Sequence, residues 1–328
     1  MSFQLGFLYS QLFASIPKPS TSFAGKTIIV TGSNVGLGKE AARHFVQNKA
    51  STVILAVRSL EKGEAAKKDI DKSTGTKDVV KVWHLDMSSY ESVLDFAARA
   101  NKELQRLDIT LLNAGVARVA WEVFEKDEST ITVNVVSTFL LAFSLLPKMK
   151  QTATKFNVRP TITTVASELH YVADFPEAKA PQGQIFNELN RKFPNPNASN
   201  MTNRYAVSKL IDVMITRAIA DRKPASSFPV TFNTLTPGLC HSELARESGF
   251  IWVIMKFFLA RTTEIGGRLL VHAGSSGPES HGQYLCDCKV ALPAAFALTT
   301  EGYEVQNRLW DELTEKLEGI KPGVTSNL

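Results

Sequence analysis

Residues 26–38 read Lys-Thr-Ile-Ile-Val-Thr-Gly-Ser-Asn-Val-Gly-Leu-Gly, and this stretch predicts the fold and a first binding site. Lys26 to Thr31 is a short run of apolar and β-branched residues, which is typical of a buried strand. The glycines that follow allow a tight turn and a close approach to a pyrophosphate. A helix is expected from Gly38 to Asn48, and its first N–H groups would point at that anion. The spacing Gly-x-x-x-Gly-x-Gly differs from the Gly-x-Gly-x-x-Gly fingerprint, but its position predicts a dinucleotide site. The residues expected in that site are Gly32, Ser33, Asn34, Gly36, Leu37 and Gly38.

Strands and helices alternate from this turn as far as residue 235. Such alternation predicts an α/β fold, a Rossmann-like doubly wound parallel sheet with helices on both faces, in a single domain over residues 25–328. Pro147 is expected to bend or end the long helix. The later strands are expected at 52–57, 79–85, 108–112, 160–165 and 230–235, and the later helices at 60–71, 89–104, 128–150 and 203–221.

Three segments break the alternation. Residues 1–24 form an apolar extension without a basic start, so a signal peptide is not expected, and it is shorter than the ~20 apolar residues of a spanning helix. We expect a short helix docked on the body, or a weak contact with a membrane surface. Residues 172–200 are rich in Pro and Asn and predict a long loop insertion. Residues 243–261 are strongly apolar and predict a lid, with a core segment as the alternative.

Composition excludes several classes of function. The 328 residues carry a net charge of +5, and the basic residues are scattered, whereas nucleic-acid binding needs a clustered stripe. The chain has only three cysteines, which favours a reducing compartment, and we expect a cytoplasmic protein, peripheral to a membrane if the N-terminal contact forms. No second Cys or His pair stands at metal-ligand spacing, so no metal site is predicted.

The end of the second strand indicates which dinucleotide is bound. An NAD site usually has an acid ~20 residues beyond the glycines. Here Glu40 is the only acid between Gly38 and Leu60, and it lies inside the helix, whereas Arg58 stands 20 residues after Gly38. A guanidinium suits the 2′-phosphate of NADP, so NADP(H) is the predicted cofactor, with an ordinary surface arginine as the alternative.

Tyr205 and Lys209 form the second informative pattern. They lie four residues apart, about one helical turn. An adjacent ammonium favours the phenolate and lowers a tyrosine pKa. By itself the pair also fits a solvated helix face, so the pair alone does not indicate a catalytic site.

Taken together, the motifs resemble the short-chain dehydrogenase/reductase family, nearest to its retinol-dehydrogenase-like and WW-domain-oxidoreductase-like branch with many fungal members. The resemblance covers roughly residues 25–245. Two features depart from the usual pattern: alanine stands before Ser167, and the span from Ser167 to Tyr205 is unusually long. The motifs in family order are residues 31–38, Asp86, Asn113-Ala114-Gly115, Ser167, Tyr205 with Lys209, and Pro237-Gly238.

The resemblance implies an NADP(H)-dependent ketoreductase or secondary alcohol dehydrogenase. Tyr205 would act as general acid/base and also contact the cofactor, Ser167 would polarise the substrate oxygen, and Lys209 would lower the Tyr205 pKa and hold the nicotinamide ribose. Asn134 would hold a water in the proton relay. Further cofactor contacts are implied for Asp86 and Met87 at the adenine, for Asn113, Ala114 and Gly115 along the cofactor, and for Pro237, Gly238 and Ser242 at the nicotinamide.

The resemblance also implies a small hydrophobic carbonyl or alcohol substrate, a place in secondary metabolism and possible homo-oligomers. Two other functions remain open at this point. One is an NADP-binding sensor or scaffold without turnover, and the other is a membrane-associated retinoid or lipid dehydrogenase.

Overall fold

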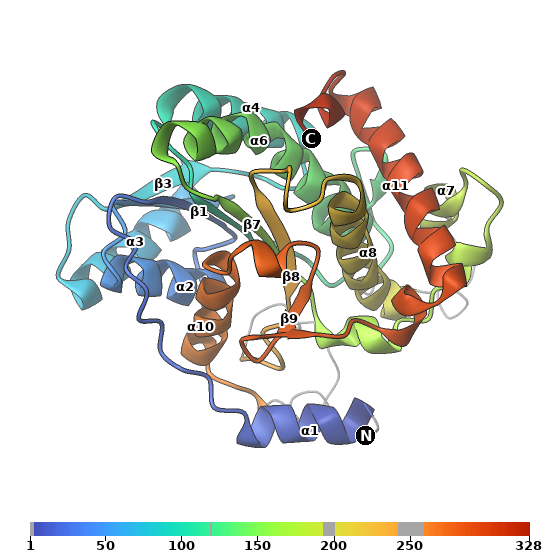
Figure 1. Cartoon of the computed structure of the whole chain (residues 1–328), viewed down its shortest axis with the longest axis horizontal. Coiled ribbons are helices and arrows are strands. Elements are labelled where there is room, and N and C mark those ends of the chain that lie inside the picture. The colour runs from blue at the N-terminus through green and yellow to red at the C-terminus, as the bar shows by residue number, and fades with distance from the viewer. Residues whose placement is uncertain (1–2, 119, 193–200, 242–258) are drawn as a thin grey trace.

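The computed structural model of the chain describes residues 3–118, 120–192, 201–241 and 259–328 (Figure 1). Ser242 and most of the expected lid, residues 243–261, lie outside the described residues. The described strands are β1 Thr27–Thr31, β2 Thr52–Val57, β3 Val80–His84, β4 Ile109–Leu112, β5 Val123–Phe124, β6 Asp127–Glu128, β7 Thr161–Val165, β8 Thr231–Leu235, β9 Tyr284–Cys286 and β10 Lys289–Ala291.

Eight of these strands form one sheet in the order β10-β9-β8-β7-β4-β1-β2-β3. Neighbours are parallel except β9 and β10, which form an antiparallel edge. The strand order reverses between β1 and β4, and in such sheets ligands bind beyond the carboxyl ends of the strands at that point. The predicted α/β doubly wound fold is confirmed.

Helices cover both faces of the sheet (Figure 1). Side chains alternate along β1: Ile28 and Val30 pack into the core beneath α2, α3 and α10, whereas Ile29 packs into the core beneath α4, α6 and α8. The helices and helical turns are α1 Phe3–Phe13, α2 Gly36–Gln47, α3 Leu60–Thr74, α4 Tyr90–Glu103, α5 Ser129–Ile131, η1 Thr132–Val136, α6 Ser137–Phe156, η2 Glu168–Val172, η3 Pro176–Lys179, α7 Ile185–Leu189, α8 Met201–Arg222, α10 Thr263–Gly274, η6 Pro278–Ser280, η7 Ala295–Leu298, α11 Thr300–Ile320 and η8 Thr325–Asn327.

The long helix predicted over residues 128–150 differs from the prediction in two ways. It contains a π-helical segment, η1, between α5 and α6, a distortion that is frequent at functional sites. It also continues past Pro147 to Phe156, so the prediction that proline ends the helix is wrong. Asn157 ends it instead, in a left-handed conformation with φ of 51°. This segment is apolar enough to span a membrane, but its most apolar window is completely buried, as in a core helix.

The insertion is more ordered than the predicted long loop. Its described part, 172–192, contains η3 and α7, and Ile185 and Phe186 are buried in the main core. The Glu312 carboxylate on α11 accepts hydrogen bonds from the backbone N–H groups of Ile185 and Phe186, at 3.1 and 2.9 Å. Apolar burial and this cap therefore fix a segment whose Pro and Asn content alone indicates a loop.

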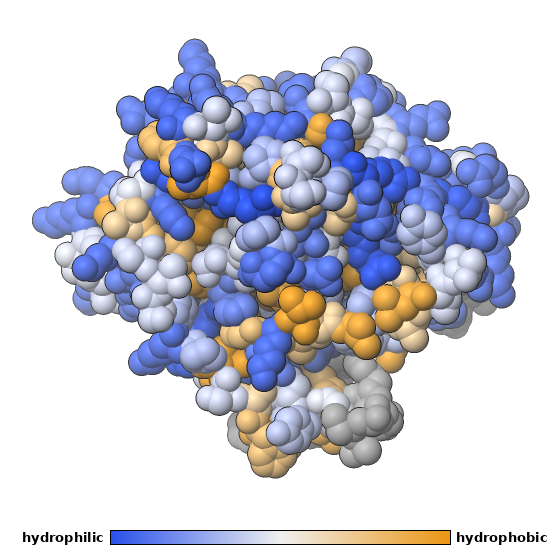
Figure 2. All heavy atoms as spheres, viewed as in Figure 1, coloured by the Kyte–Doolittle hydropathy of each residue, from blue (hydrophilic) through white to orange (hydrophobic). Residues whose placement is uncertain are grey.

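The N-terminal helix α1 lies against the carboxyl end of the sheet. Arg261 Nη2 donates to the carbonyl oxygen of Ser10 at 2.7 Å, and the Ser10 hydroxyl donates to Asp287 Oδ2 at 2.6 Å. The other side of α1 remains exposed, and the exposed fractions of Tyr9 and Phe13 there are 61% and 70%. Figure 2 shows apolar atoms in the lower part of the molecule in this view. The predicted docking of this helix is confirmed, and the contact with a membrane surface stays a prediction.

Candidate functional site

The turn between β1 and α2 is shaped by its glycines. Gly32 and Gly36 have φ of 64° and 60°, values that favour glycine. A side chain at Gly32 would come within 3.0 Å of Ala114 Cα, whereas the space beside Gly36 is open. The residue before α2, Val35, gives no side-chain cap to the helix, so the N–H groups of the first turn have no intrahelical partner. An uncapped helix N-terminus beside an open glycine turn fits a dinucleotide pyrophosphate.

Asn113 joins the ends of β4 and β1 across the point where the strand order reverses. Its Nδ2 donates to the carbonyl oxygens of Thr31 and Gly32, at 2.9 and 3.2 Å, and its backbone N–H donates to Thr31 Oγ1 at 2.9 Å. A Cβ at Gly38 would stand 2.6 Å from this amide nitrogen. Asn113 therefore braces the floor of the turn. The Ser33 hydroxyl also turns inward and donates to Val30 O at 2.7 Å, and the residue is buried, so its hydroxyl is not directed at a cofactor.

The expected adenosine end lies beyond β2 and β3. Ala56 pairs with Thr31 in the sheet, which places Arg58 beside the glycine turn. Arg58 is exposed, and its guanidinium forms no ion pair with the described residues. Asp86 Oδ1 accepts hydrogen bonds from the backbone N–H and the hydroxyl of Ser88, at 2.9 and 2.7 Å. These contacts hold Asp86 at the end of β3, and Met87 beside it is buried.

The four expected catalytic side chains come together from three elements. Ser167 follows β7 and lies close enough to Tyr205 on α8 to lower the pKa of its hydroxyl. Lys209 Nζ lies 5.8 Å from the centre of the Tyr205 ring and donates to Val165 O at 2.8 Å. A Cβ on Gly115 would stand 3.2 Å from Asn134 Oδ1 and 3.8 Å from Lys209 Nζ, so Asn134 borders the same space.

Asn134 has its amide engaged by protein groups. Its Nδ2 donates to Ser208 Oγ and to Val116 O, both at 2.9 Å, and its Oδ1 accepts from Val116 N at 2.9 Å. The side chain thus ties the segment after β4 to α8. A water relay through this residue would use its main-chain carbonyl, in the π-helical segment.

The pKa of the Tyr205 hydroxyl is shifted in opposite directions by its surroundings. Burial raises the pKa of Tyr205, Lys209 and Ser167 lower it, and the charge of Asp212 raises it again. Lys209 therefore acts in the predicted direction, but burial outweighs it in the protein alone. Asp212 was missed by sequence reasoning, although an acid three residues after Lys209 on a helix is a recognisable ion-pair spacing.

His170 lies in η2, three residues after Ser167. Its Nδ1 lies 2.7 Å from Ser167 O, which can only accept, and its Nε2 lies 3.1 Å from the backbone N–H of Ala294, which can only donate. The ring must therefore be neutral with its proton on Nδ1. Burial accordingly lowers the pKa of His170 to about 4. His170 thus holds the main chain of Ser167 in place.

The expected nicotinamide end follows β8. Gly238 has φ of 72° and its N–H donates to Thr236 Oγ1 at 3.1 Å. With its amide oriented to suit its neighbours, Gln11 of α1 donates to the carbonyl oxygens of Leu239 and Leu259 and accepts from Leu239 N. Helix α1 therefore braces the chain just after Pro237-Gly238.

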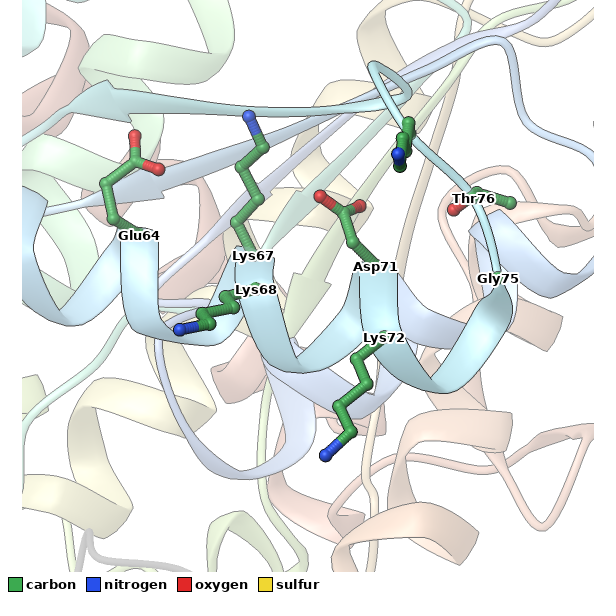
Figure 3. A pocket seen from close by; sticks show the side chains of 8 residues that line it. Glu64, Lys67, Lys68, Asp71, Lys72, Gly75 and Thr76 are labelled. Atoms are coloured by element: carbon green, nitrogen blue, oxygen red, sulfur yellow. The ribbon is translucent and has the colours of Figure 1, made fainter.

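A shallow hollow of about 420 Å³ lies on α3, away from this site (Figure 3). None of its lining residues belongs to the candidate site, so we assign it no role. Within the described ranges, no group of three or more His, Cys, Asp or Glu could hold a metal ion. The hollow is lined by Glu64, Lys67, Lys68, Asp71, Lys72, Gly75, Thr76 and Lys77.

Comparison with known proteins shows the family of the chain. Residues 26–169 match the family model for short chain dehydrogenases. A short chain dehydrogenase/reductase of Cryptosporiopsis sp. (strain 8999) is 56% identical over 326 residues, covering 98% of this chain and 100% of the relative. The crystal structure of an uncharacterized protein from Mycobacterium paratuberculosis is 25% identical with a TM-score of 0.66, covering 91% of this chain and 95% of that one. A short chain dehydrogenase from Shigella flexneri, complexed with NADP, shares the fold at 20% identity and a TM-score of 0.56, covering 81% and 98%. The chain therefore belongs to the short-chain dehydrogenase/reductase family of oxidoreductases.

Proposed function

We propose that the protein is an NADP(H)-dependent ketoreductase or secondary alcohol dehydrogenase that acts on a small hydrophobic carbonyl or alcohol, in secondary metabolism. The observation that carries the proposal is the grouping of Ser167, Tyr205 and Lys209 at the carboxyl edge of the sheet, beside the open glycine turn. A scaffold without turnover would have no need to keep these three side chains together.

The residues divide the chemistry among them. When bound, the cofactor supplies or accepts the hydride at the substrate carbon. In reduction Tyr205 donates its proton to the carbonyl oxygen, and Ser167 donates a hydrogen bond to the same oxygen. Lys209 favours loss of the Tyr205 proton through its positive charge. Gly32, Gly36 and the first turn of α2 would hold the pyrophosphate, and Arg58 would hold the 2′-phosphate.

A panel of ketones, aldehydes and secondary alcohols, monitored by NADPH absorbance, tests this function. Turnover of at least one apolar member is expected. Tight NADPH binding without turnover of any member would contradict the proposal and favour the scaffold.

The NADP preference follows from Arg58 and is tested separately. Arg58→Asp places a carboxylate where the 2′-phosphate would lie, so NADPH binding is expected to weaken about 100-fold, since a charge-assisted hydrogen bond contributes ~1.5–3 kcal/mol. NADH binding should change little or improve. Dissociation constants from NAD(P)H fluorescence measure both effects, and Lys62→Asp, near the start of α3, is the matched control. Equal losses for the two cofactors would refute the role of Arg58.

A peripheral membrane contact is a second candidate property, favoured by the open side of α1. Leu8, Tyr9, Leu12 and Phe13 are all exposed there. The pairs Leu8 with Leu12 and Tyr9 with Phe13 are each one turn apart. No acidic residue precedes Glu40, so nothing in this segment repels an anionic lipid surface.

Replacing Phe13 with serine should weaken such a contact. Burial of one large apolar side chain contributes ~1.5–3 kcal/mol, so binding of the intact chain to phosphatidylcholine–phosphatidylserine vesicles is expected to fall at least about tenfold. Co-sedimentation measures the bound fraction, and Leu298→Ser, at an exposed position on η7, is the control. A wild-type chain that stays in the supernatant would exclude the contact.

A further inference from the structure

Asp212 is completely buried beside the candidate catalytic residues. Its Oδ2 lies 3.0 Å from Lys209 Nζ, and its Oδ1 has no hydrogen-bond partner in the described part of the chain. Tyr205, Lys209 and Asp212 stand at positions i, i+4 and i+7 of α8, which places them along one side of the helix. The buried carboxylate of Asp212 is therefore on the same side of α8 as Tyr205 and Lys209.

The geometry gives Asp212 two effects on Lys209. An ammonium has three N–H donors, and here Asp212 and Val165 O take two of them. The side chain is therefore held with its third donor left for another group. In addition, the negative charge of Asp212 offsets the positive charge that Lys209 presents to Tyr205.

Few other described titratable groups lie where their charge could act on Tyr205, Lys209 and Asp212. On η2, the Glu168 carboxylate faces Cys286 and feels the charges of Asp287 and Arg261, and His170 is neutral. On η3, Glu177 is paired with Arg204.

On the remaining neighbouring elements, the described charged side chains are engaged elsewhere. Glu128, the last residue of β6, caps α5 with its carboxylate, and on α11, Gln306 and Glu312 bond to Arg217 and to the start of α7. Burial raises the pKa of Asp212 to about 6, and among the described residues Lys209 is the only charged group that opposes this.

We propose that Asp212 is a positioning residue of this site, which holds the Lys209 ammonium and counterbalances its charge at the Tyr205 hydroxyl. This inference rests on the proposed function for its kinetic consequence, but its effect on Tyr205 does not require turnover. Removing the negative charge leaves the charge of Lys209 uncompensated, so Tyr205 loses its proton at lower pH.

Asp212→Asn tests the charge, because asparagine keeps an oxygen that accepts from Lys209. The pH at which kcat for alcohol oxidation is half-maximal is expected to fall by about 1 unit, in line with the effect of a nearby charge. Asp212→Glu keeps the charge and should retain the wild-type value. Asp221→Asn is the matched control, since Asp221 lies on the same helix but pairs with Gln306 at 2.8 Å.

A second measurement needs neither substrate nor cofactor. The absorbance of tyrosinate is titrated in each protein and in the same protein carrying Tyr205→Phe, and the difference reports Tyr205 alone. The Tyr205 step is expected at lower pH in Asp212→Asn than in the wild type. Asp212→Ser provides the same test if the asparagine variant does not fold.

Identical Tyr205 titrations in the wild type and both uncharged variants would overturn the inference. If no substrate is found but the Tyr205 titration shifts as expected, the proposed function fails while the role of Asp212 stands.

Discussion

Tyr205→Phe is expected to lower kcat by about 10²–10⁴-fold, the contribution of a positioned general acid, while the dissociation constant for NADPH changes less than about threefold. Phenylalanine keeps the ring beside Lys209 but removes the one proton that the substrate oxygen needs. Most of the groups expected to hold the dinucleotide, in the glycine turn, at Arg58 and at Lys209, do not depend on this hydroxyl. Single-turnover kinetics and cofactor fluorescence separate the two effects.

Tyr171→Phe is the matched control. Tyr171 lies near the site but donates its hydroxyl hydrogen bond to Leu292 O at 2.6 Å. Its loss should therefore leave kcat within about threefold of the wild type. Near wild-type turnover in Tyr205→Phe would remove Tyr205 from the mechanism, even if the family assignment holds.

The fold was predictable because its signals are local. The run at 52–57 is apolar and β-branched, and β2 covers the same residues. Ser89 caps α4, since its hydroxyl accepts from Ser92 N, and serine is a preferred residue at the start of a helix. The glycine turn was equally clear, because a positive φ and a close approach to Ala114 both demand glycine.

Long-range contacts explain what the sequence did not reveal. Pro147 was expected to bend or end its helix, but the helix extends to Phe156 and is buried along most of its length, so packing outweighs the lost hydrogen bond. For Asp212 the sequence shows only its spacing of three residues from Lys209, and the residues around it in the sequence do not indicate that it is buried. The edge strands β9 and β10 are three residues each, too short for a periodic pattern to predict.

The insertion illustrates the same limit most clearly. Its composition predicts a loop, yet Glu177 in η3 forms an ion pair with Arg204 at 2.8 Å, and both side chains are buried. Arg204 immediately precedes Tyr205. The insertion is thus fixed to α8 directly beside the candidate catalytic residue.

Breaking this pair should cost more stability than breaking any exposed pair in the described chain. Arg204→Met leaves the Glu177 carboxylate buried without its counter-charge, and Glu177→Leu does the same to Arg204. Each single change is expected to lower the free energy of unfolding by about 3–5 kcal/mol. Urea denaturation at constant pH measures the loss, and Glu103→Gln, in the exposed pair with Arg99, should cost only about 0.3–0.5 kcal/mol.

The double variant Arg204→Met with Glu177→Leu tests whether this pair only stabilises the fold or also sets the position of Tyr205. Without either charge no desolvated ion remains, so most of the lost stability should return and the two changes should couple strongly. If the pair also sets the position of Tyr205, the double variant will recover stability but not kcat. Recovery of both would show that burial of apolar residues is enough to align the insertion with α8. Losses below about 1 kcal/mol in both single variants would mean that apolar packing alone, around Ile185 and Phe186, holds the insertion against the catalytic helix.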